Sequence, residues 1–164
     1  MRRREALAMA AAAGVSMALP WEAPANARAI LTIGDARLAS YFALADGVIA
    51  GSWTPPHALD ETVDRWYRQM PSMSREHADF VLDLAGMLAG QPNSLAAQDK
   101  HTSRQLVKSW LDGRALPPAA REFTAMRWNS LVPASAFSHS AVALIAEVLP
   151  VPGFVPDRQH EEMP

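Results

Sequence analysis

The chain has 164 residues, a formal net charge of −2 and no cysteine. This length suits one domain with a real core. The slightly acidic balance disfavours nucleic acid and anionic lipid as partners, because both select for clustered Lys and Arg. The missing thiols exclude disulfides, iron–sulfur clusters, c-type haem attachment and cysteine-based zinc sites or catalysis.

Residues 1–27 have the pattern of a secretory signal peptide. Arg3 and Arg4 precede an uncharged, alanine-rich run over residues 6–19, which falls short of the ~20 residues that span a bilayer. The arginine pair, Leu7 and the weak hydrophobicity of the run are typical of twin-arginine signals. That route exports proteins already folded, so we expect a twin-arginine translocase as partner and a periplasmic location.

The small residues Ala25 and Ala27 form a pattern that signal peptidase accepts, so cleavage is expected after Ala27. Two other interpretations of the segment stay open, because Ala6 stands where twin-arginine signals have a bulky apolar residue. One is an ordinary leader for unfolded export. The other is an alanine-rich first helix of a cytoplasmic protein.

Prolines, glycines and N-cap residues divide residues 28–149 into about five short helices, so the predicted fold class is all-α, a small helical bundle. Residues 28–34 form a connector before the first helix. The expected N-caps are Asp35, Asp60, and Thr102 or Ser103. The expected helices run from Asp35 to Gly51, from Asp60 to Pro71, from Ser72 to Gly90, from Thr102 or Ser103 to Gly113, and from Pro117 to Pro133.

The last part of the chain has a different character. Residues 141–149 form a short apolar run, for which periodicity does not decide between strand and helix. Pro150, Pro152 and Pro156 follow at close spacing, and proline favours extended backbone on either side. Residues 150–164 are therefore expected to form an extended C-terminal arm.

No catalytic, cofactor-binding or metal-ligating residue is predicted in this chain. The densest group of possible metal ligands is Glu76, His77, Asp79 and Asp83, and its spacing matches no His-Glu-x-x-His motif. We interpret this group as a solvated helix face. A free-standing periplasmic enzyme or a metal- or ligand-binding protein that uses it is the alternative.

Two further sites invite a functional interpretation. Asp99, His101 and Ser103 have the residue types of a hydrolase triad, but no Gly-x-Ser-x-Gly elbow presents the serine, which favours a polar loop. Trp53 lies in a proline-rich loop. It is expected either to anchor a protein interface or to fold back as a lid on the core.

Three landmarks follow one another in the second half of the chain: Trp110 to Gly113, Glu122 to Met126, and Pro152-Gly153-Phe154. Their order, behind a leader, resembles the small (gamma) subunit of membrane-bound FAD-dependent sorbitol, fructose and glucose dehydrogenases. Leu111 and Val155 stand where that family has aromatic residues. The small subunits of gluconate 2-dehydrogenase-type complexes are a related possibility.

The resemblance implies that the chain is not catalytic by itself and holds no cofactor. Such a subunit accompanies a FAD-containing dehydrogenase subunit that oxidises a sugar or polyol and passes electrons to a multihaem cytochrome c subunit. The catalytic subunit generally lacks a leader and is exported with the small one. We expect Trp53, Pro152, Gly153 and Phe154 to contact this partner, and the complex to associate with the membrane.

Overall fold

The computed structural model describes residues 32–49, 53–114, 116–128 and 134–154, without the side chains of Trp128, Ala134 and Ser135. The chain divides into two units, residues 1–32 and 33–164, and the fold described below is that of the second. The expected export signal and cleavage site lie outside the described residues: Arg3, Arg4, Leu7, Ala25 and Ala27.

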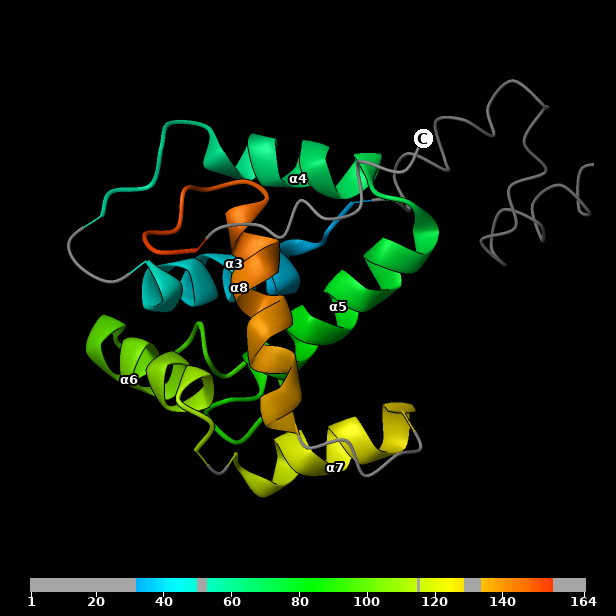
Figure 1. The fold of residues 1–164 in the computed structure, drawn as a ribbon, viewed down its shortest axis with the longest axis vertical. Helices are drawn as coiled ribbons and strands as arrows, with labels where there is room; N and C mark the ends of the chain where they lie inside the picture. The colour runs from blue at the N-terminus through cyan, green and yellow to red at the C-terminus, as the bar shows by residue number, and fades with distance from the viewer. Residues whose placement is uncertain (1–31, 50–52, 115, 129–133, 155–164) are drawn as a thin grey trace, which may run out of the picture. The chain divides into compact units, whose positions relative to one another are not determined.

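The described residues form six α-helices and one 3₁₀ turn and contain no strand, which confirms the all-α expectation (Figure 1). No helix in these ranges is long and apolar enough to cross a membrane. The elements are α3 (Asp35–Val48), α4 (Leu59–Gln69), α5 (Ser72–Gly86), α6 (Lys100–Leu111), α7 (Pro118–Trp128), η1 (Ala134–Phe137) and α8 (Ser138–Ala146).

Helix α3 is the centre of the bundle, because it packs against α4, α5, α6 and α8. In Figure 1, α8 crosses α3, with α4 above, α5 to the right, α6 to the left and α7 below. Tyr41, Leu44 and Ala45 of α3 are fully buried, and Trp110 of α6 is the largest fully buried side chain among the described residues. The burial of these apolar side chains is the main force that holds the helices together.

Aromatic rings fix the position of α7. Phe80 of α5 stacks on Phe123 of α7, with ring centroids 5.3 Å apart. The same ring meets Phe137 of η1 edge-on at 4.8 Å. Such pairs add ~0.5–1.5 kcal/mol each beyond the area that they bury.

Two predicted N-caps are wrong by one or two positions. Helix α3 begins at Asp35 itself, with Gly34 as N-cap, and α4 begins at Leu59, with Ala58 as N-cap in the left-handed conformation at φ 55°. Asp35 and Asp60 instead stand in the first helical turn. An acidic side chain in the first turn is stabilised by the positive end of the helix dipole. An aspartate near a helix start therefore does not show by itself whether it is the N-cap or a residue of the first turn.

The cap of α6 also differs from the expectation. Asp99, rather than Thr102 or Ser103, is the N-cap, and its carboxylate accepts hydrogen bonds from the Thr102 backbone N–H at 3.0 Å and hydroxyl at 2.6 Å. Helix α5 ends at Gly86, before the predicted Gly90. The Gly86 carbonyl accepts hydrogen bonds from the backbone N–H groups of residues 94 and 95, so the chain turns back there.

The apolar run 141–149, left open between strand and helix, is mostly helical and belongs to α8. Helix α8 contacts α3, α5 and α6. Its residues Ala141, Leu144 and Ile145 are buried. A helix this enclosed has apolar residues on several faces, which explains why its sequence shows no single stripe.

The expected extended arm is wrong for its described part, residues 150–154. The Phe154 N–H donates to the Val151 carbonyl at 3.2 Å, and Gly153 has φ 78°, so residues 151–154 form a turn. Proline followed by glycine at the two central positions is the preferred sequence of a type II turn. Val151 packs against the core, and the Phe154 ring lies edge-on to His139, at 6.2 Å between centroids. Residues 155–164 lie outside the described part.

Candidate functional site

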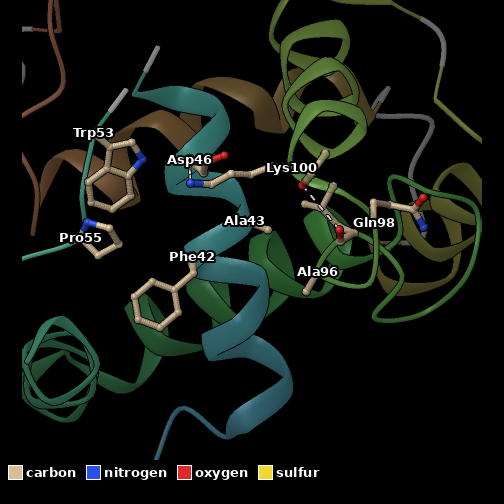
Figure 2. Close-up of a pocket in the computed structure, with 10 residues that line it drawn as sticks. Phe42, Ala43, Asp46, Trp53, Pro55, Ala96, Gln98 and Lys100 are labelled. Carbon is tan, nitrogen blue, oxygen red and sulfur yellow. Dashed lines mark hydrogen bonds and ion pairs between the residues drawn. The ribbon is translucent and has the colours of Figure 1, made fainter. Parts of the chain in front are cut away.

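A pocket of about 260 Å³ lies between α3, the segment that follows it and the start of α6 (Figure 2). Phe42, Trp53 and Pro55 line it on one side of α3, and Ala96 and Gln98 line it on the other. The second side is formed by the loop between α5 and α6. This loop is held by hydrogen bonds from the backbone N–H groups of residues 94 and 95 to the Gly86 carbonyl. The pocket is therefore mostly apolar and has an aromatic wall.

The polar end of the pocket is an ion-paired carboxylate, Asp46 of α3, which is only 8% exposed. Arg104 of α6 donates to both of its oxygens, from Nε at 2.7 Å and from Nη2 at 3.0 Å. Lys100 stands farther away, with Nζ 3.7 Å from Oδ1. Burial raises the pKa of Asp46, but the hydrogen bonds and charges of these cations outweigh burial, so the pKa lies below its usual range.

The structure places Trp53 half-buried against the core, and its contact with a partner stays a prediction. Its indole Nε1 is buried and has no hydrogen-bond partner. Figure 2 shows this nitrogen facing Asp46. Its N–H is the smallest of the influences that lower the pKa of that carboxyl group. The ring itself still forms part of the pocket wall.

Asp79 and Asp83 do not form the solvated face that we expected, because Arg37 of α3 contacts both. Arg37 makes a two-point contact with Asp83, at 2.8 and 3.0 Å, and an ion pair with Asp79 at 3.1 Å. The hydrogen bonds and charge of Asp83 outweigh burial and raise the pKa of Arg37. Tyr67 donates to Asp79 at 2.7 Å, and burial, together with this bond, raises the pKa of Tyr67 to about 12. His77 takes no part in this network.

Within the described ranges, no three His, Asp or Glu side chains are placed to hold a metal ion. The residues with triad-like types do not converge either. Ser103 is buried and donates to the Leu95 carbonyl at 3.5 Å, while His101 is exposed and pairs with Gln105 at 2.9 Å. Asp99 is the cap of α6. The predicted polar loop is thus the start of a helix.

An exposed methionine surface was missed by the sequence reasoning. Met73 is 84% exposed and Met126 is 79% exposed. Met73 stands between two hollows of about 380 and 490 Å³, which share His77. Glu147 lines the first and Arg127 the second. The sequence does contain one indication that Met73 is exposed. It stands between two serines, outside the apolar pattern of its helix.

The landmarks behind the family resemblance have different structural roles. Trp110 is fully buried, and Gly113 closes α6 at φ 72°, so both serve the fold. Met126 is exposed, and Gly153 shapes the turn that places Phe154 beside His139. Comparison of the chain with models of known protein families, with curated proteins and with solved structures yields no match.

Proposed function

We propose that this chain is a non-catalytic small subunit that escorts a FAD-dependent sugar or polyol dehydrogenase through the twin-arginine route and stays bound to it in the periplasm. FAD belongs to the partner in this proposal, and a multihaem cytochrome c subunit accepts the electrons. The identity of the partner rests on the order of the sequence landmarks. The export role rests on Arg3 and Arg4 ahead of an uncharged run that contains Leu7.

The surface around Met73 is the structural observation that supports partner binding best. An exposed methionine between two hollows presents apolar, flexible side-chain atoms that adapt to a partner surface. Arg127 and Glu147 line the neighbouring hollows with charges of both signs. An apolar centre with polar neighbours is the usual build of a non-obligate protein interface.

The ion pairs of the body also support a structural role. Asp79 and Asp83 are held by Arg37, and Asp46 is held by Arg104. The two-point contacts of Arg37 with Asp83 and of Arg104 with Asp46 link α3 to α5 and to α6. Asp46 is in addition a poor general base, because burial raises its pKa less than the arginine and lysine lower it.

The export role is tested by expressing the chain with its candidate flavoprotein partner. Changing Arg3→Lys together with Arg4→Lys is expected to hold both proteins in the cytoplasm, whereas Arg2→Lys, which keeps the arginine pair, leaves export intact. Immunoblots of periplasmic and cytoplasmic fractions, with flavin-dependent activity, give the readout. Export of the partner with the doubly changed leader, or without this chain, overturns the proposal.

The interface is tested separately with Met73→Asp. Since Met73 is 84% exposed, the substitution is expected to leave the melting temperature nearly unchanged while it removes the partner from a pull-down. Ala97→Asp, which adds the same charge at another exposed position, is the matched control. Full recovery of the partner with Met73→Asp would show that this surface is not the contact.

A further inference from the structure

The Asp46 carboxylate at the polar end of the pocket contacts two cations, although one is enough to balance its single negative charge. Arg104 neutralises it through two short hydrogen bonds. Lys100 adds a second positive charge at 3.7 Å, and the Trp53 N–H faces the same carboxylate without a partner. The pocket end therefore carries one positive charge beyond what Asp46 balances.

Lys100 is the donor that can leave this group at least cost. Its side chain is 69% exposed, and its contact with Asp46 is the longest of the three made by the two cations. Exposed ion pairs of this kind contribute little. When Lys100 turns away, Arg104 still holds both oxygens of Asp46 through its two hydrogen bonds, so the Lys100 ammonium is free to meet a ligand.

The rest of the pocket selects for an apolar body. Phe42, Trp53 and Pro55 offer flat and rigid apolar surfaces, and Ala96 lines the opposite side. Leu95 also contributes to the lining. Its volume of about 260 Å³ is small beside the ~300–1,000 Å³ of pockets that take drug-sized ligands. One aromatic ring or one branched aliphatic group with a short polar end suits this space.

We propose that this pocket binds an apolar carboxylate, with the hydrocarbon part against Phe42, Trp53 and Pro55 and the carboxylate on the Lys100 ammonium. A free aromatic or branched acid and the C-terminal residue of a partner chain present the same chemistry. The site is independent of the export role, and it lies on different residues from the Met73 surface.

The test is calorimetric titration of the full chain with 3-phenylpropionate and with its neutral amide. A second pair of probes is a tetrapeptide ending in Phe, with a free or an amidated C-terminus. The variant is Lys100→Gln, and the matched control is Lys108→Gln, which removes an exposed charge from the same helix. Circular dichroism checks that each variant is folded.

The acids are expected to bind about tenfold more tightly than their amides, as loss of one charge-assisted contact implies. Lys100→Gln is expected to remove this preference, and Lys108→Gln to keep it. Binding of the free acid alone identifies a small ligand, and binding of the peptide acid alone identifies a chain end. Equal affinity for acid and amide, an equal effect of both lysine substitutions, or no binding of any probe at millimolar concentration overturns the proposal.

Discussion

Replacing Gly47 with Ala is expected to push α3 and α6 apart. An ideal Cβ at Gly47 lies 2.5 Å from Cβ, 2.7 Å from Cγ1 and 2.9 Å from Cγ2 of Val107. Val107 is fully buried, and its Cβ is fixed to the backbone of α6, so rotation of the side chain does not remove the closest contact. The two helices must separate to accept the methyl group.

Two effects of opposite sign decide how much Gly47→Ala changes the free energy of unfolding. Alanine in a helix interior is ~0.5–1 kcal/mol more favourable than glycine. Overpacking a well-packed contact costs ~1–3 kcal/mol, and the rigid Cβ–Cβ approach places this case in the upper part of that range. The net expectation is a loss of about 1–2 kcal/mol in the free energy of unfolding, with a melting temperature several degrees lower.

Urea unfolding of the full chain, followed by far-ultraviolet circular dichroism, measures this loss. Gly86→Ala is the matched control, because the atom nearest its new Cβ is the Ser40 hydroxyl oxygen at 3.0 Å and the next are backbone atoms of Asn93 at 3.6 Å, so a smaller change is expected. Val107→Ala combined with Gly47→Ala removes two of the three close atoms, so the double variant should lose less than the sum of the single ones. A stabilising Gly47→Ala, or strict additivity, would refute the reasoning.

Three other expectations concern the ion pairs and the turn. Arg37→Gln is expected to lower the free energy of unfolding by about 1 kcal/mol in urea titrations, and Arg37→Lys to restore only part, because lysine makes no two-point contact; an unchanged midpoint for the glutamine variant would contradict this. Burial raises the pKa of Asp46, but its cationic partners lower the pKa by more than burial raises it. The pKa of Asp46 in the folded protein therefore lies below its value in the unfolded chain. The stability that this shift contributes is thus present above the unfolded pKa of ~3.9 and is lost as the pH falls through the folded pKa. Asp46→Asn should lower the free energy of unfolding at neutral pH and make the loss of stability below pH ~4 shallower. An equally steep loss of stability in the variant would count against this assignment. Gly153 has φ 78°, so Gly153→Ala should destabilise the turn by ~1 kcal/mol. As the Phe154 ring moves away from His139, the NMR signals of the His139 ring should shift. Unmoved signals would show that the turn persists.

Local chemistry explains why most helix boundaries were predictable. Pro71 separates α4 from α5, Gly113 closes α6 in a conformation that favours glycine, and Pro118 opens α7. The N-caps were harder, because Asp35 and Asp60 suit the cap and the first turn equally well. These errors leave the all-α fold class unchanged.

The candidate site was not predictable from local patterns, because its parts come from distant positions. Asp46 pairs with Arg104, which is 58 residues away, and Arg37 pairs with Asp83, which is 46 residues away. Periodicity shows which residues are buried but not which charges meet. The orientation of Trp53 likewise depends on the packing of α3 against the loop before α4, which the sequence left open between two arrangements.

The position of α8 in the bundle has a consequence for timing during synthesis. Helix α8 packs on α3 and α5, and the Trp66 indole N–H donates to the Glu147 carboxylate at 2.7 Å across 81 residues of chain. Until the ribosome has made α8, those faces of α3 and α5 stay open to water and to chaperones. In the proposed export, the leader thus emerges well before its own domain can close.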